Sequence, residues 1–301
     1  MVDAALSMPV ADIEAAKAAR RRILGRVGVY GFLTVFALIY ILPLVVIVAN
    51  SFRELPEIAQ NGLIGFPHSL TFKGWIQAWS SYCVGGTCQG VRPNFINSLE
   101  LTIPATIIST LLGAMNGYIL SKWRFRGSEV IFNCMVLGVF MPGQISLMPW
   151  AYILGKIGLA NSTGGLILIH CVQGLSFTTL FCRNYYVNIP DDLIKAARID
   201  GAGFWRIFVK IILPLSPPIL IVTVIWQFTG IWNEYLFGAV FTSGRGQPIT
   251  AALISLASNE TNARIYDVMS AAVLIGAVPP LLIYFFGGKY FVRGLTQGAI
   301  K

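Results

Sequence analysis

The sequence predicts an all-α polytopic membrane protein with six transmembrane helices. Of its 301 residues, 55% are hydrophobic and only 12% are charged, and the mean hydropathy is +0.70. A soluble domain carries roughly 25% charged residues, about twice this share. Uncharged or nearly uncharged runs of roughly 20 residues, long enough to cross a bilayer core, recur along the chain. We place the six spans at Gly28–Ala49, Leu101–Ser121, Val130–Leu154, Gly165–Cys182, Pro218–Val240 and Val268–Gly288.

The basic residues outside these spans indicate the orientation of the chain. If the spans alternate, sixteen of the 22 Lys and Arg residues fall on one face, and basic residues near span ends are retained in the cytoplasm. We therefore expect both termini in the cytoplasm, and this topology accounts for the net charge of +9. The sequence has no basic stripe with interleaved aromatic residues, so it does not predict nucleic-acid binding. The sixteen residues are Lys17, Arg20, Arg21, Arg22, Arg26, Lys122, Arg124, Arg126, Arg183, Lys195, Arg198, Arg206, Lys210, Lys289, Arg293 and Lys301.

The spans divide the chain into segments with different expected environments. Residues 1–26 form a cytoplasmic N-terminal segment, which either lies along the membrane surface or is solvated. Residues 27–50 form the first transmembrane helix, 51–96 an outer loop, 97–288 the membrane core with a cytoplasmic loop at 184–213, and 289–301 a cytoplasmic tail. In the outer loop, four residues separate Cys83 from Cys88, on the oxidising side of the membrane. A disulfide between them is favoured over two free thiols.

The cytoplasmic loop places charged, helix-forming residues between two apolar runs. Pro190, Asp191 and Asp192 are typical of a first helical turn, because proline needs no amide hydrogen there and carboxylates complement the helix dipole. A helix-turn-helix on the membrane face would suit docking into a groove of a separate protein; the alternative is a helix that only anchors the loop at the interface. The expected elements are two turns over Leu193–Ile199, a sharp turn at Gly201, and a second helix over Gly203–Ile212 that Pro214, Pro217 and Pro218 end.

Residues in this loop also carry a resemblance to a known family. The positions of Ala196, Ala197, Asp200, Gly201, Ile211, Leu213 and Pro214 match the spacing of the EAA loop of ABC importer permeases. The chain from Asn94 onward resembles the second permease subunit of maltose-type carbohydrate importers, as FRG at 125–127, MPGQ at 141–144, WNEY at 232–235 and YFVRGLTQGAIK at 290–301 indicate. The resemblance implies a type I permease of the bacterial cytoplasmic membrane.

The resemblance implies two contacts with ATPase subunits. One is made by the coupling loop, at Lys195, Ala196, Ala197, Arg198, Asp200, Gly201 and Ala202. The other is made by the C-terminal tail, at Thr296, Gln297 and Gly298. One position departs from the family pattern, because the glutamate that opens the EAA motif is Lys195 here. Any contact that the glutamate makes with the ATPase is therefore not carried over to this chain.

The same resemblance implies a complex in which other subunits hydrolyse ATP. The partners are a second permease subunit in a heterodimer, two cytoplasmic ATPase subunits, and an extracytoplasmic sugar-binding protein. This chain has no GxxxxGK[ST] phosphate-binding loop and only two His residues without metal-ligand spacing, so we expect no enzyme activity, cofactor or metal. The CVGGTCQG stretch resembles glucose- or mannose-type importers, which favours a monosaccharide such as these; a short oligosaccharide stays open.

Within the spans, Glu234 is the main polar residue to explain. An ionised carboxylate near a bilayer centre costs at least ~2.5 kcal/mol unless it faces protein or water. Glu234 would lie near the outer end of the fifth span, either at a sugar pathway or in a structural hydrogen bond. His170 has no evident acidic partner and is expected to be packed. An ion-driven secondary transporter, the competing class, would require paired intramembrane charges. The candidate pathway residues are Gln144, Gln227, Trp232, Asn233 and Glu234.

Overall fold

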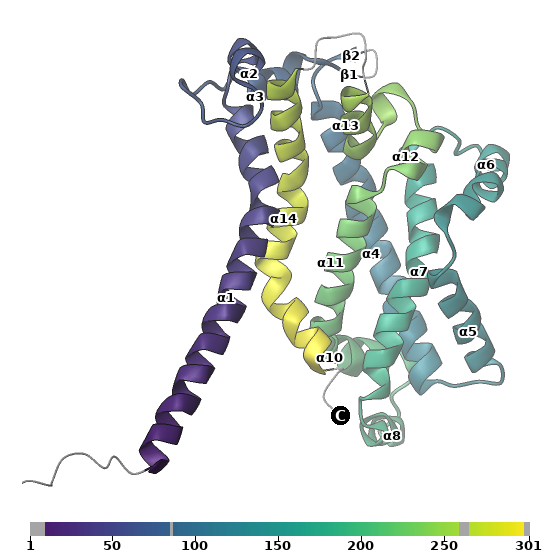
Figure 1. Cartoon of the computed structure of the whole chain (residues 1–301). Helices are drawn as coiled ribbons and strands as arrows, with labels where there is room; N and C mark the ends of the chain where they lie inside the picture. The colour runs from purple at the N-terminus through teal and green to yellow at the C-terminus, as the bar shows by residue number, and fades with distance from the viewer. Residues whose placement is uncertain (1–9, 85–86, 259–264, 298–301) are drawn as a thin grey trace, which may run out of the picture.

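The computed structural model describes residues 10–84, 87–258 and 265–297, and almost all of its regular structure is helical (Figure 1). The predicted all-α class is confirmed, with one short hairpin, β1 (Cys83–Val84) and β2 (Thr87–Cys88), among the described residues. The long helices are α1 (Val10–Ser51), α4 (Arg92–Lys122), α7 (Thr163–Val187), α11 (Pro217–Asn233) and α14 (Tyr266–Gln297). The shorter ones are α2 (Leu55–Asn61), α3 (Lys73–Ile76), η1 (Gln77–Ser81), α5 (Ser128–Val139), η2 (Gly143–Ser146), α6 (Leu147–Lys156), α8 (Asp191–Ile199), α9 (Phe204–Ile207), η3 (Phe208–Ile212), α10 (Leu213–Leu215), α12 (Leu236–Phe241), η4 (Gly244–Gly246) and α13 (Ile249–Ala257).

The number of membrane spans depends on two bent helix pairs. Within the described residues, α1, α4, α7 and α14 are each long and apolar enough to cross a membrane. The α5–α6 pair is bent by 105° and the pair formed by α9–α10 and α11 by 79°; counting each pair as one span gives up to six, the predicted number. The predicted fifth span, Pro218–Val240, corresponds to α11, which ends at Asn233, and to part of α12, and does not include α9–α10. The third expected span, Val130–Leu154, is not a single helix, because α5 ends at Val139 and Pro142 disfavours helix in the residue before it.

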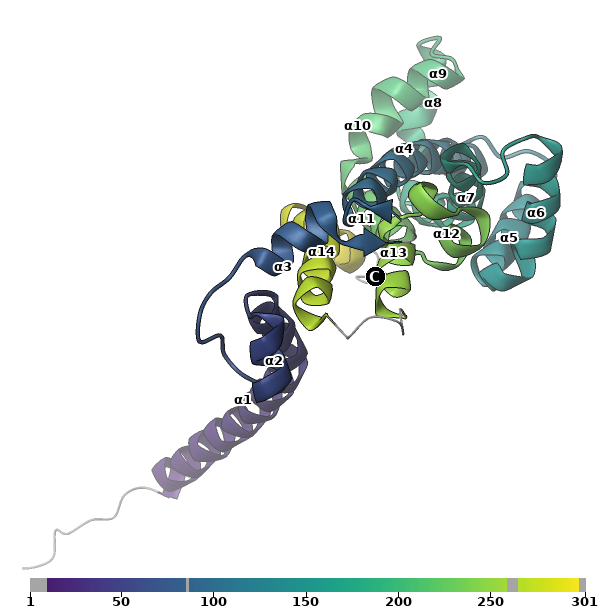
Figure 2. The same ribbon diagram turned by 90° about the horizontal axis from the view of Figure 1, so that it is seen from above.

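The centre of the fold is the contact between α4 and α7, the most extensive helix pair in the described part of the chain. Two glycines of α4 make this close approach possible. A Cβ built on Gly113 would lie 2.1 Å from Oγ1 of Thr178, and one built on Gly117 would lie 2.7 Å from the backbone nitrogen of Arg183. Small residues allow membrane helices to pack backbone against backbone. Helix α11 packs on both members of this pair, α5 packs mainly on α7, and α14 packs on α11 (Figure 2).

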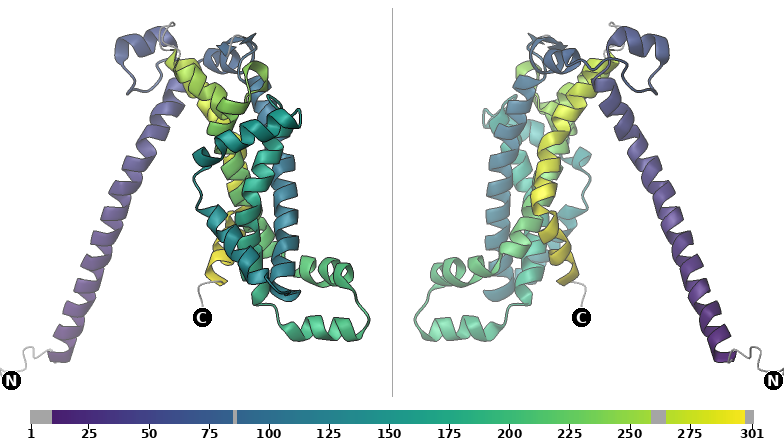
Figure 3. Two further views of the ribbon diagram at one scale, coloured as in Figure 1. Left: turned by 90° about the vertical axis from the view of Figure 1, so that its right-hand side faces the viewer. Right: turned by 90° about the vertical axis from the view of Figure 1, so that its left-hand side faces the viewer.

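Helix α1 stands apart from the bundle over much of its length. It contacts α14 near one end and diverges from it toward the other (Figure 3). The described side chains from Ala19 to Leu44 are all exposed, and most of them are apolar. Such a surface is stable in contact with lipid or with another apolar helix. The expected N-terminal segment is continuous with the first span from Val10 onward.

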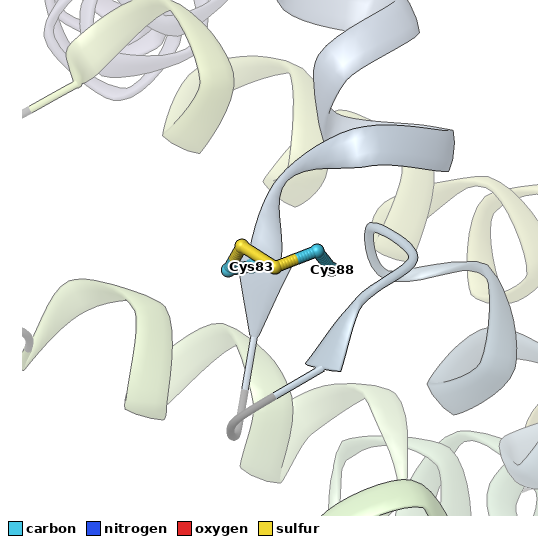
Figure 4. Close-up of a disulfide and its surroundings, with 2 residues drawn as sticks. All are labelled: Cys83 and Cys88. Atoms are coloured by element: carbon cyan, nitrogen blue, oxygen red, sulfur yellow. A yellow bond between two sulfur atoms is a disulfide. The ribbon is translucent and has the colours of Figure 1, made fainter.

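The two ends of the bundle carry different structures. At one end, which we call the hairpin end, lie α2, α3, η1 and the β hairpin, where Cys83 and Cys88 form a disulfide (Figure 4). At the other, the α8 end, lie α8 and α10 (Figure 1). The turn after α1 is fixed by the buried Arg53, which donates to the side chain of Glu57 at 3.0 Å, to Oδ1 of Asn50 at 2.9 Å and to the carbonyl of Gly62 at 3.0 Å.

We predict that Gly117→Ala destabilises the protein by about 1–3 kcal/mol, because the added methyl group has no room against the α7 backbone. Thermal unfolding in detergent, followed by tryptophan fluorescence, measures the effect. The matched control is Gly28→Ala in α1, where a Cβ meets nothing within 4 Å. Equal unfolding temperatures for the two variants would contradict the close α4–α7 contact.

Candidate functional site

Helix α8 forms the centre of a segment at the α8 end of the bundle. It begins at Asp191, in the first turn that the sequence predicts from Pro190, Asp191 and Asp192, because proline and the two carboxylates favour helix there. It ends before Gly201, whose φ of +76° is a left-handed conformation that suits glycine. The sharp turn expected at Gly201 is therefore present, and it turns the chain toward α9.

Helix α8 has one face against the bundle and one face turned away from it. Ile194 is buried, whereas Ile199 is 86% exposed and Leu193 is also exposed. Ile199, at the last position of α8, is an apolar side chain that a docked protein would cover. Among the predicted contact residues, Ala197 and Ala202 are half-buried, and the exposed ones are Lys195, Ala196, Arg198, Asp200 and Gly201.

Two residues at the end of α4, the basic Lys122 and the aromatic Trp123 that follows it, hold α8 in place. The Lys122 side chain is only 4% exposed; its Nζ lies 2.6 Å from Oδ1 of Asp191 and donates to the carbonyl of Ile189 at 2.5 Å. The guanidinium of Arg198 lies 4.0 Å from the ring centre of Trp123 and donates to the Lys122 carbonyl at 3.3 Å. The Lys122 hydrogen bond lowers the pKa of Asp191 below its ordinary value of 3.8. The ion pair therefore persists until the pH falls below that value.

An aromatic cluster attaches the second half of the segment to α4. Tyr118 stacks on Phe208 with ring centres 5.5 Å apart and contacts Phe204 at 5.0 Å. The Trp123 indole packs against Phe204 and donates to the Tyr118 hydroxyl. These rings are buried or half-buried. Both halves of the segment thus rest on the same end of α4.

The second helix of the segment differs from the prediction. It was expected over Gly203–Ile212 and to be ended by proline, but helical structure runs from Phe204 through the π turn η3 to Leu215 and includes Pro214. Proline is accepted there because it occupies the first turn of α10, and the π turn before it changes the hydrogen-bonding register. The chain bends at Ser216, whose hydroxyl lies 2.9 Å from the Tyr186 hydroxyl of α7.

A second feature is a cavity of about 370 Å³ between α7, α11 and the break that follows α5. Polar groups line much of it. Gln173 donates to the Ser146 hydroxyl at 3.1 Å, and Gln227 donates to the His170 carbonyl at 3.4 Å. Trp226, which is 52% exposed, stacks on Phe177 with ring centres 4.8 Å apart. The cavity therefore combines amide groups with an aromatic face.

Glu234 lies at the hairpin-end side of this cavity, where α11 stops. Its carboxylate accepts hydrogen bonds from the backbone nitrogens of Phe237, at 2.9 Å, and Gly238, at 3.4 Å, and so caps α12. It also lies 3.9 Å from Nε2 of His170. The expectation that His170 has no acidic partner was wrong, because the two residues are 64 positions apart and only the packing of α7 on α11 brings them together.

The candidate pathway residues divide into two groups. Gln227 and Glu234 line the cavity. Trp232 does not; it is 2% exposed, donates to the Gly276 carbonyl at 2.9 Å and stacks on Phe228. Gln144 and Asn233 are exposed and are not part of the cavity lining. The prediction missed four lining residues on one face of α7, whose helical spacing was the available signal: His170, Gln173, Gly174 and Phe177.

The remaining expectations concern the tail and metal binding. Thr296 and Gln297 belong to the last turn of α14, and Gly298 lies outside the described residues. Within the described ranges, no group of three His, Cys, Asp or Glu side chains is arranged to hold a metal ion.

We predict that Lys122→Met loosens α8, because it leaves Asp191 and the Ile189 carbonyl without the ammonium group. A loss of about 1–3 kcal/mol speeds amide hydrogen exchange in α8 by roughly fivefold or more. Hydrogen exchange with mass spectrometry measures this. Lys156→Met, at the exposed end of α6, is the control and leaves α8 exchange unchanged; equal exchange in both variants would refute the role of Lys122.

Comparison with known proteins places these features in one family. Over 187 residues the chain is 44% identical to a probable ABC transporter permease of Pyrococcus horikoshii, covering 62% of this chain and 67% of the relative. It is 29% identical to the diacetylchitobiose uptake permease of Streptomyces coelicolor, with 90% and 88% covered, and 29% identical to a glucose import permease of Saccharolobus solfataricus, with 88% and 92% covered.

A solved structure supports the same fold. A bacterial ABC transporter chain involved in import of the acidic polysaccharide alginate superposes with a TM-score of 0.77 at 20% identity, covering 90% of this chain and 97% of the other. The match at this identity concerns the fold of the bundle. The family model for the inner membrane component of binding-protein-dependent transport systems matches residues 109–297, which include α8 and most of the bundle. The chain belongs to this family of ABC transporter permeases, which are transport subunits and not enzymes.

Proposed function

We propose that this chain is one permease subunit of an ATP-driven carbohydrate importer. It pairs with a second permease subunit in the cytoplasmic membrane. Two ATPase subunits bind at the α8 end and hydrolyse ATP, and an extracytoplasmic sugar-binding protein delivers the substrate at the hairpin end. Family membership and the sugar-transporting relatives support this assembly. The segment from α8 to α10 carries the proposal, because the exposed Ile199 offers an apolar contact to a partner and the segment is attached to α4.

The α8 end faces the cytoplasm in this proposal, with both termini on that side. Basic residues gather at this end. They are Lys122 and Arg124, at and just after the end of α4, and Lys195 and Arg198 on α8. Retention of such residues in the cytoplasm supports the orientation. The disulfide at the hairpin end supports the same assignment, because disulfides persist in the oxidising extracytoplasmic space.

Coupling follows from the contacts of α8. ATP binding closes the ATPase pair and displaces the exposed face around Ile199. Because Lys122 and Trp123 hold α8 against α4, the displacement is transmitted to α4 and to α7 packed on it. Helix α7 lines the cavity, so its movement alters which side of the membrane the cavity opens to. The proposed motion is a rigid-body shift of packed helices about an interface.

The cavity supports a carbohydrate as the substrate. Gln173, Gln227 and Glu234 offer donors and acceptors for hydroxyl groups, and the Trp226 ring offers an apolar face for sugar C–H groups. Its volume of about 370 Å³ lies near the lower end of the range for small-molecule sites, roughly 300–1,000 Å³. This favours a monosaccharide such as glucose or mannose, or a short oligosaccharide, with the partner permease completing the pathway.

The approach of His170 to Glu234 favours a second candidate, an ion-driven secondary transporter. Paired titratable groups in a membrane are typical of proton relays. The capping bonds that Glu234 accepts from Phe237 and Gly238 give this carboxylate a structural task instead. Uptake that follows a proton or sodium gradient without any co-purifying ATPase would favour the ion-driven candidate.

The first test is Ile199→Asp in the complex purified in nanodiscs with its binding protein. The substitution puts a charge into the apolar docking surface, and losing about 1.5–3 kcal/mol of burial lowers sugar-stimulated ATP hydrolysis roughly tenfold or more. ATPase activity with a panel of sugars measures the effect and identifies the substrate. Ile199→Leu keeps the apolar surface and retains stimulation. Full stimulation in Ile199→Asp would show that α8 does not couple the subunits.

A second variant tests the cavity. Trp226→Ala removes the aromatic face, and a loss of about 0.5–1.5 kcal/mol of stacking weakens apparent sugar affinity by roughly 2- to 12-fold. Trp226→Phe keeps a ring and retains most of the affinity. Uptake of labelled sugar over a range of concentrations gives the values. If Trp226→Ala transports with unchanged affinity while Ile199→Asp fails to couple, the sugar passes elsewhere in the complex.

A further inference from the structure

A second cavity, of about 480 Å³, lies beside α8 at the α8 end of the bundle. Its wall is formed by the end of α4, the end of α7 and the bundle-facing side of α8. Four cationic side chains and one carboxylate line it: Lys122, Arg124, Lys195, Arg198 and Asp191. A concave surface with such an excess of positive charge attracts anions.

The cations differ in how far they are already engaged. Lys122 and Asp191 neutralise each other at 2.6 Å. Arg124 donates through Nε to the Ser121 carbonyl at 3.3 Å, and Arg198 donates to the Lys122 carbonyl. A guanidinium has five N–H donors, and within the described chain each of these arginines uses one. Most of their donors therefore remain for a ligand in the cavity.

Lys195 adds to this positive charge, and only a weak ion pair has to break for its ammonium group to reach a ligand. Its pair with Asp192, at 3.1 Å, joins two exposed side chains, 70% and 91% accessible. Exposed pairs of this kind contribute little to stability, so the ammonium group is easily redirected to a ligand. An acidic residue at this position would instead place a second carboxylate in the cavity wall. Position 195 thus decides whether the cavity is strongly or weakly basic.

Two details point to phosphate as the anionic group. The Arg198 guanidinium is held over the Trp123 ring, 4.0 Å from its centre, so its planar fork, which suits phosphate oxygens, is positioned before a ligand binds. The cavity also lies where α4 and α7 end, beside the exposed apolar side chains of Val187 and Phe125. In the proposed orientation the ends of α4 and α7 face the cytoplasm, and basic pockets between membrane spans on that side bind phosphate-bearing headgroups.

We propose that this cavity binds a phosphate-bearing anion, which bridges Arg124 after α4 to Lys195 and Arg198 on α8. The bound anion connects α8 to the end of α4, in addition to the contacts that Lys122 makes with Asp191 and the Ile189 carbonyl. The chemistry is shared by an anionic phospholipid headgroup and by free phosphate.

Binding is tested on the full-length protein with its co-purifying subunits, independently of transport. Phosphatidylglycerol retained in competition with phosphatidylcholine is counted by native mass spectrometry. Arg124→Gln with Lys195→Gln removes two cations and leaves the Arg198 stack intact. Each basic residue near an anionic surface contributes about 1 kcal/mol, or about fivefold in affinity, so we expect the loss of two to lower retention roughly 25-fold. Lys195→Glu alone also lowers retention, by a charge reversal at an exposed site that α8 does not need for folding.

Two further arms make the outcome decisive. Arg20→Gln with Arg126→Gln removes equal charge from exposed positions outside the cavity and keeps wild-type retention. Equilibrium dialysis with inorganic phosphate in neutral lipid identifies the source of the anion: binding with the same dependence on Arg124 and Lys195 assigns a soluble phosphate, and its absence beside retained phosphatidylglycerol assigns the lipid. Overturning the proposal requires only that neither anion distinguishes the wild type from the double variant.

Discussion

The close packing of α4 on α7 is the constraint on which the other features depend. Glycine at positions 113 and 117 allows the two backbones to approach, so the ends of both helices lie at one level. At this level Lys122 of α4 can reach the carbonyl of Ile189, two residues beyond α7. A larger separation would leave that carbonyl and Asp191 without their partner. The position of α8 thus depends on two positions of α4 that carry no side chain.

Breaks in the helices are placed where polar groups can satisfy the backbone. Unpaired N–H and C=O groups are tolerated at membrane depth only when protein or water covers them. After α11 ends, the Glu234 carboxylate accepts from the backbone of Phe237, and the Thr250 hydroxyl donates to the Glu234 carbonyl at 2.7 Å. The break after α5 likewise borders the cavity, where Ser146 and Gln173 are paired. The irregular backbone and the polar cavity therefore occupy the same place.

Sequence reasoning found what depends on composition and local spacing. The spans follow from uncharged runs, and α8 follows from Pro190 and two carboxylates, because these signals act within a few residues. It failed where distant residues meet: nothing near His170 in the chain indicates that Glu234 is its neighbour. It also placed Trp232 in the cavity because amphipathic aromatic residues suit sugar sites, whereas the indole packs toward α14. Trp226, six residues earlier in α11, faces the cavity instead, because six residues at about 100° each place the two side chains on different faces of the helix.

In the proposed importer, α7 borders both the cavity and the basic cavity beside α8, and a displacement of α8 reaches the first cavity through this helix. From Phe177, at the cavity, to Val187, at the wall of the basic pocket, α7 is an uninterrupted helix. Ten residues at 1.5 Å each span about 15 Å, and a helix packed on α4 over this distance moves as one body. Coupling between the two regions then needs no chain of switching side chains, only two positions of α7 that the ATPase and the substrate favour differently. Anything that fixes α8 to the end of α7 strengthens this coupling, because it removes slack between the driven element and the helix that lines the cavity.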